Sequence, residues 1–308
     1  MRIFAYYLRC CTVAAGCCLT LLFACEEPVE LNIDIPKSRL VINSNFYPNE
    51  LVVLRISSTR PIGGVSHANI DNAEVSLFEG TELAESLEYL PDPETAGAGS
   101  YRTKVFRPKV GQQYTIHVAA EGYDPVTAVS SIPDPIAITS IAINGLTKMT
   151  VDDLTTYDYS LLIDYADPVE ETNYYDLRIY QEVIGYKMSA KGDTVRQSAY
   201  LKSVGTPTRA AGQGATVSVL LRDKCQMNAI EVHLQSQLDA SRELPGEIVA
   251  ELRTVSPEYY FYKRSLLGYE GTSLPLNEPV ILFNNVDQGL GVFAGYNSVQ
   301  QKLLLLPE

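Results

Sequence analysis

The sequence predicts a mainly β protein in which an immunoglobulin-like or transthyretin-like β-sandwich is followed by a larger β-rich domain with one amphipathic helix. Three observations support this fold class. Short segments with period-two alternation or many β-branched residues recur along the chain, separated by turn-forming residues. A proline-rich break at Ser131–Pro135 divides shorter segments from longer ones. Residues 257–270 alone have a helical pattern.

Residues 1–24 have the composition of a lipoprotein signal peptide. Arg2 and Arg9 precede an uncharged apolar run that ends at Phe23 and is too short to span a bilayer as a mature helix. The motif Leu22-Phe23-Ala24-Cys25 resembles a lipobox, where bacteria attach diacylglycerol to the cysteine sulfur, cleave before the cysteine and acylate the new amine. We therefore predict that Cys25 is lipidated. An ordinary signal peptide and an uncleaved anchor are the alternatives.

Residues 25–37 are predicted to form a lipidated, extended stalk, because they are acidic and contain two prolines. A single acyl chain gives only marginal membrane binding, so three chains on Cys25 would hold the protein on the lipid bilayer without spanning it. The acidic residues behind Cys25 resemble the export signal of Bacteroidota surface lipoproteins. That resemblance implies an outer-membrane location with the protein facing the cell surface.

Charge and cysteine content narrow the possible partners and the means of stabilisation. Loss of residues 1–24 would leave 22 basic and 37 acidic residues, a net charge of −15, which disfavours nucleic acid and anionic headgroups. Besides Cys25, only Cys225 would remain, so no intramolecular disulfide could form. For Cys225 we favour a small buried hydrophobe over a nucleophile.

Residues 38–133 are predicted to form the immunoglobulin-like sandwich. Its expected strands are short and are separated by turns that contain proline, asparagine or glycine. The segments with strand patterns are residues 39–46, 51–57, 73–80, 100–106 and 113–123.

Residues 134–308 are predicted to form the β-rich domain, with longer strands and the helix. Ser256 is the expected N-cap, Pro257 the first helical residue and Glu258 part of the first turn. A stripe of tyrosine and leucine on this helix is expected to pack on the sheet.

The segments "DPVEETNYYDLRIY" (167–180), "VSPEYYFYKRSL" (255–266) and "NEPVILFNNVDQGLGVFAGYNS" (277–298) carry a resemblance to a known family. They resemble the domain-of-unknown-function 4249 family of Bacteroidota, and the resemblance extends over essentially the whole mature chain. It implies a lipoprotein similar in setting to those that accompany TonB-dependent outer-membrane transporters. It implies no catalytic residues.

No catalytic residue, metal ligand or cofactor is predicted. The histidines lack zinc spacing, and no nucleophile elbow or calcium-loop motif occurs. The glycines of "VDQGLGVFAGY" lack the spacing and context of a dinucleotide loop, so we expect a bulged strand or a close approach of two backbones.

Tyrosine is abundant and clusters in the predicted second domain. Its apolar ring and polar hydroxyl suit contacts with glycans, peptides or other proteins, whereas cross-strand packing is the structural alternative. The candidate binding residues are Tyr157, Tyr174, Tyr175 and Tyr186.

Together these features predict a non-catalytic binding or assembly module, anchored at the cell surface and accessory to a TonB-dependent transporter in nutrient uptake. The alternative is a stand-alone glycan-binding or adhesin lipoprotein. A hydrolase is the third hypothesis, and only scattered carboxylates support it.

Overall fold

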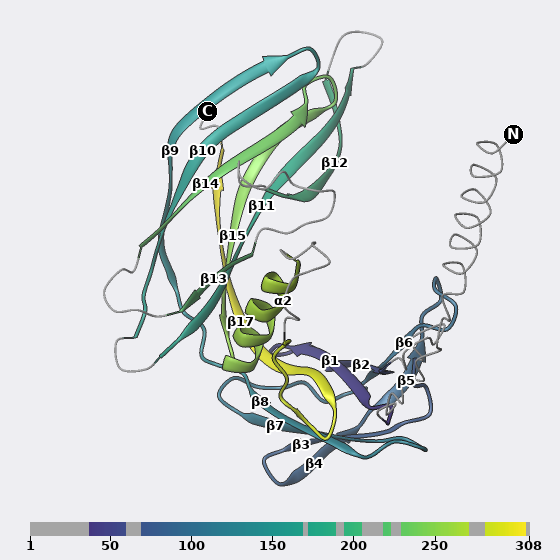
Figure 1. The fold of residues 1–308 in the computed structure, drawn as a ribbon. Coiled ribbons are helices and arrows are strands. Elements are labelled where there is room, and N and C mark those ends of the chain that lie inside the picture. Colours follow the sequence, from purple (N-terminus) through teal and green to yellow (C-terminus); the bar gives the residue numbers. More distant parts are fainter. Residues whose placement is uncertain are drawn as a thin grey trace, which may run out of the picture. The chain divides into compact units, whose positions relative to one another are not determined.

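The computed structural model describes residues 37–59, 69–168, 172–188, 194–204, 218–222, 229–270 and 281–305. Within these ranges the chain is mostly strand, with one helix, α2 (Pro257–Glu270), as Figure 1 shows. The residues from Ser38 onward form one compact unit. The sequence prediction of a mainly β protein with a helix at residues 257–270 is confirmed.

The first sandwich consists of two sheets around one core. One sheet carries β1 (Leu40–Phe46), β2 (Val53–Ser58), β6 (Gly99–Arg102) and β5 (Glu88–Pro91), and the other carries β8 (Val126–Ser131), β7 (Gln113–Ala119), β3 (Glu74–Glu79) and β4 (Glu82–Ser86). Inward residues alternate with outward ones, as the period of a strand requires. We call the buried apolar cluster between these sheets the first core.

The second sandwich has longer strands, as predicted. One sheet contains β9 (Ile138–Val151), β10 (Leu154–Tyr165) and β14 (Ala229–Asp239). The other contains β12 (Thr194–Ser203), β11 (Tyr174–Met188) and β15 (Glu243–Val255), and β13 (Ser218–Arg222) also pairs with β11. We call the buried cluster between them the second core.

The strand β17 (Leu290–Leu304) takes part in both sandwiches (Figure 1). Its first part pairs in parallel with β1, from Val41–Leu290 to Phe46–Gly295, and its later part pairs with β15. The short strand β16 (Val286–Asp287), just before it, pairs with β8. The end of the chain therefore completes the first sandwich, which the boundary predicted near residue 133 did not anticipate.

The predicted boundary itself stays a prediction. Ile132 belongs to the first core and Ile136 to the second, so the chain does pass from one core to the other at this point. Val286 and Phe293, however, return to the first core from the far end of the sequence.

The glycines of the C-terminal motif allow β17 to approach its neighbours. Gly291 has φ +108°, and a Cβ added to it would lie 1.9 Å from the carbonyl oxygen of Ile42. A Cβ on Gly295 would lie 2.2 Å from the carbonyl oxygen of Ser131. The close approach of two backbones expected from the sequence is confirmed, since no other residue type fits these positions.

Helix α2 begins as its sequence predicts. The N–H of Tyr259 donates to the Ser256 hydroxyl oxygen at 3.3 Å, which is an N-cap contact. Tyr259 and Tyr260 are buried in a small cluster with Val255 of β15 and Val292 of β17. The helix thereby covers the face of the sheet that points away from both cores.

Candidate functional site

The predicted lipidation site cannot be compared with the structure, because Cys25 and the rest of residues 1–36 lie outside the described residues. Cys225 lies outside them as well. Lipidation of Cys25 and the role of Cys225 therefore stay predictions.

Two of the four candidate binding tyrosines are core residues. Tyr157 and Tyr175 are 3% and 0% exposed, and both belong to the second core. The ring of Tyr175 meets that of Tyr165 edge-on at 5.3 Å, and its hydroxyl donates to the Asp167 carboxylate. Such burial supports the packing alternative for Tyr157 and Tyr175, because a surface ligand could not reach their rings.

Tyr174 and Tyr186 are half-buried and lie in separate contacts. The ring of Tyr174 packs against Tyr260 of α2 at 4.7 Å and against Phe261 at 5.5 Å. The Tyr186 hydroxyl donates to the carbonyl oxygen of Ala240 at 2.7 Å. The four tyrosines therefore do not form one recognition surface.

A buried charged cluster, consisting of Asp176, Arg178, Glu251 and Arg253, lies on β11 and β15. Asp176 is opposite Arg253 and Arg178 is opposite Glu251 in the strand register, so the signs alternate. The ion pairs themselves run along each strand. Arg178 Nε donates to Asp176 at 3.0 Å and Arg253 Nε donates to Glu251 at 2.8 Å. Buried charges of this kind are candidates for a functional site.

The hydrogen bonds of the charged cluster indicate a structural role. The Tyr259 hydroxyl of α2 donates to Asp176 at 2.7 Å and accepts from Arg178 at 2.8 Å. Burial, and next the negative charge of Asp176, raise the pKa of Tyr259, so this hydroxyl keeps its proton. Burial alone would lower the pKa of Arg178. Nearby groups, chiefly the negative charge of Asp176, outweigh this effect, and the pKa of Arg178 is raised. The cluster is paired internally and ties α2 to the sheet.

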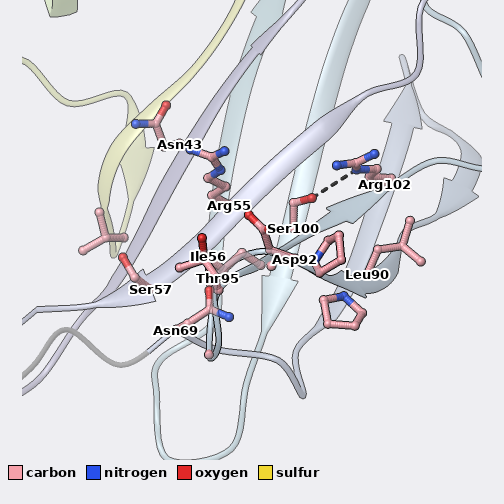
Figure 2. A pocket seen from close by; sticks show the side chains of 16 residues that line it. Asn43, Arg55, Ile56, Ser57, Asn69, Leu90, Asp92, Thr95, Ser100 and Arg102 are labelled. Atoms are coloured by element: carbon pink, nitrogen blue, oxygen red, sulfur yellow. Dashed lines mark hydrogen bonds between the residues drawn. The ribbon is translucent and has the colours of Figure 1, made fainter.

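A polar pocket of about 670 Å³ lies on the first sandwich. Its floor is the outer face of β1, β2 and β6, opposite the first core, and the loop between β5 and β6 forms its wall (Figure 2). This volume falls within the usual range for small-molecule sites. All of its lining residues lie in the part of the chain that the structure describes, and we treat the pocket as the candidate functional site.

The lining of the pocket is rich in hydrogen-bonding side chains. Amide and hydroxyl groups come from both the floor and the wall, namely from Asn43, Ser57, Asn69, Thr95 and Ser100. Asp92 supplies a carboxylate, and two arginines supply positive charge. Figure 2 shows Arg55 near Asn43, its register partner on β1, and Arg102 hydrogen-bonded to Ser100.

The wall of the pocket is fixed by its own hydrogen bonds. The N–H of Asp92 donates to the Ala98 carbonyl oxygen at 3.0 Å, and Asp92 Oδ1 accepts the N–H of Glu94 at 2.9 Å. Beneath this loop, Asn69 Nδ2 donates to the Tyr89 hydroxyl at 2.8 Å. A Cβ on Gly99 would lie 2.2 Å from that hydroxyl, so the glycine is required for this packing. The pocket is thus formed before any ligand arrives.

Sequence reasoning did not find this pocket. The candidate binding residues predicted from the sequence were tyrosines of the second domain instead. The available signal was the pair of arginines at outward-facing positions of two strands, Arg55 and Arg102. Only the strand order, in which β2 pairs with β6, shows that they share one face.

These features define a mainly β protein with two sandwiches and a preformed polar pocket. The family model described as "Domain of unknown function (DUF4249)" matches residues 26–302, and the chain belongs to this family. A search of curated proteins found no match. The family carries no established function, so it assigns no role to any residue.

Two further findings concern the described part of the chain. No group of three or more histidine, cysteine, aspartate or glutamate residues there is arranged to hold a metal ion. None of the helices in that part has both the length and the apolar character needed to cross a bilayer.

Proposed function

We propose that this protein is a lipid-anchored surface lipoprotein that acts as a non-catalytic binding module, accessory to a TonB-dependent outer-membrane transporter in nutrient uptake. The lipobox-like motif at Cys25 supports the anchor. The acidic stalk behind it supports a location at the cell surface. Membership of the family, together with the resemblance described above, supports the association with a transporter.

The polar pocket carries the binding part of the proposal. Its walls are held in place without a ligand, so little conformational entropy is lost when one binds. The lining offers hydrogen-bond donors and acceptors from several elements, which can fix the orientation of a small polar molecule. A protein that captures nutrients before transport requires such a site.

A stand-alone glycan-binding or adhesin lipoprotein is the second candidate. The amide and hydroxyl groups in the pocket favour it equally, because they can bind sugar hydroxyls without any transporter. The two candidates differ in whether the protein has a partner in the outer membrane.

Lipidation is tested by labelling with a fatty acid in a bacterial host. The wild-type protein should incorporate the label and Cys25→Ala should not, while Cys225→Ala should behave like wild type. Labelling of Cys25→Ala at the wild-type level would disprove the anchor.

The transporter association is tested by affinity purification of the tagged, full-length protein from native outer membranes. We expect a TonB-dependent transporter to co-purify with wild type in stoichiometric amounts. Protease accessibility in intact cells measures surface exposure at the same time. A surface-exposed protein that binds sugars but carries no transporter would support the stand-alone candidate and contradict the accessory role.

A further inference from the structure

Arg55 has no ion pair or hydrogen bond among the described residues, and it lines the pocket. Several arginines, by contrast, are paired with a carboxylate: Arg107 with Glu50, Arg178 with Asp176, Arg242 with Asp239 and Arg253 with Glu251. In a chain with 37 acidic and 24 basic residues, partners are plentiful. Arg55 instead lies at the pocket with all its donors available.

Arg102 adds a second guanidinium to the same pocket, and this one is held in place. Its Nε donates to the Ser100 hydroxyl oxygen at 3.1 Å, which leaves the two Nη groups for a ligand. Asp92 is the carboxylate among the lining residues, and its Oδ1 already accepts the Glu94 N–H. The pocket therefore carries a net positive charge on an acidic protein, and this favours an anion.

The planar fork of arginine matches the geometry of a carboxylate, to which it can donate two parallel hydrogen bonds. Around the arginines, the lining supplies amides and hydroxyls beside aliphatic side chains such as Val41 and Leu90. Asn43 lies across from Arg55 in the strand register, and Asn69 and Thr95 line the pocket with them. Such groups suit the hydroxyls of a sugar better than the side chains of a peptide.

We infer that the pocket binds a carboxylate-bearing sugar, a hexuronate or a short oligosaccharide containing one. The carboxylate is held by Arg55 with support from Arg102, and the sugar hydroxyls are held by the surrounding amides and hydroxyls. This inference rests on the proposed binding function and names its ligand class. The lining contains no aromatic ring, so hydrogen bonds and charge, not ring stacking, select the ligand.

The test is isothermal titration calorimetry on the detergent-purified full chain, with galacturonate and galactose as a matched pair of ligands. We expect galacturonate to bind and galactose to bind at least about tenfold more weakly, because a charge-assisted bidentate contact is lost. The affinity for galacturonate should fall as salt is added. Glucuronate, an acidic dipeptide and inorganic phosphate serve as further probes.

Arg55→Gln is the decisive variant, with Arg107→Gln as its control. Arg55 is exposed, so its substitution should leave the melting temperature unchanged while weakening galacturonate binding about tenfold. Arg107 is also exposed but pairs with Glu50 outside the pocket, so Arg107→Gln should bind like wild type. Arg102→Gln should weaken binding less than Arg55→Gln does.

Each outcome decides the inference. Equal binding of galactose, tighter binding of the dipeptide or phosphate, or unchanged binding by Arg55→Gln would overturn the acidic-sugar assignment. So would the absence of binding to both hexuronates at millimolar concentrations. None of these results affects the co-purification experiment, so a wrong ligand class is distinguishable from a wrong proposed function.

Discussion

The two sandwiches use aromatic and polar residues for different ends. In the first sandwich, an outward face that carries two arginines forms the floor of a polar pocket. The second sandwich buries many of its tyrosines and pairs its charges internally beneath α2. The tyrosines and the charged residues of the second sandwich therefore serve packing, whereas the candidate site lies in the first sandwich. Residue type alone did not separate these uses, because a ring suits a core and an interface equally well.

Two buried tyrosine hydroxyls, one from each core, also differ in their hydrogen bonding. In the first core, the Tyr101 hydroxyl accepts the N–H of Ala73 at 2.8 Å and donates to the Ile70 carbonyl oxygen at 3.0 Å. In the second core, the hydroxyl of fully buried Tyr159 has no partner among the described residues. Burial of the Tyr101 hydroxyl is therefore compensated by hydrogen bonds, whereas burial of the Tyr159 hydroxyl is not.

The largest effect is expected where the two sandwiches share a strand. Gly291→Val places side-chain atoms against the Ile42 backbone at a positive φ, and we expect it to cost at least about 4 kcal/mol of unfolding free energy. Gly122→Ala is the control. It also has positive φ but open space around it, so it should cost only about 1 kcal/mol. Denaturant unfolding measures both.

Hydrogen exchange on Gly291→Val shows how far the damage spreads. Because β17 pairs with β1 and with β15, amides in both sandwiches should lose protection. If amides lost protection only in the first sandwich, the two sandwiches would be uncoupled. That result would favour independent domains that meet near the predicted boundary.

The sequence predicted the mainly β fold and the helix, because alternation and capping are local signals. It also indicated that the C-terminal glycines permit a close backbone approach. It could not show that β17 pairs in parallel with β1, since that contact joins residues about 250 positions apart and leaves no periodic trace.

The candidate site was less predictable for the same reason. Arg55 and Arg102 look like ordinary exposed strand residues until strand order places them on one face. The tyrosines attracted attention by number, yet Tyr157 and Tyr175 alternate inward. Period-two alternation states that neighbouring residues face opposite ways, but it does not say which face is covered.

The second largest effect concerns the buried charged cluster of the second sandwich. Asp176→Asn leaves Arg178 buried without its ion pair, and we expect a loss of about 3 kcal/mol of unfolding free energy. Glu88→Gln in the first sandwich is the matched control. It removes an exposed ion pair with Lys104, so it should cost less than about 1 kcal/mol. Similar losses for the two variants would remove the contrast between buried and exposed pairs.

A smaller effect comes from deleting single tyrosine hydroxyls in the two cores. Tyr101→Phe leaves the N–H of Ala73 and the buried carbonyl oxygen of Ile70 without their hydrogen-bond partner, so it should cost about 1–2 kcal/mol of unfolding free energy. Tyr159→Phe removes a hydroxyl that has no partner in the described structure, and it should be neutral or slightly stabilising. If Tyr159→Phe destabilised as much as Tyr101→Phe, the hydroxyl of Tyr159 would have a partner after all.

The smallest effect on unfolding free energy is expected at high pH. It comes from the ionisation of Tyr159 and involves no lost hydrogen bond. Burial raises the pKa of Tyr159 above its ordinary value of 10, so the folded protein holds this proton longer than the unfolded chain does. The contribution of the protonated Tyr159 to the free energy of unfolding is therefore fully present below pH 10, and it declines as the pH rises further. Tyr159→Phe cannot lose a proton, so its stability relative to wild type should increase steadily above pH 10. Denaturant titrations of both proteins from about pH 8 to about pH 11 measure this difference, and a difference that stays constant across the range would mean that burial does not hold the proton on Tyr159.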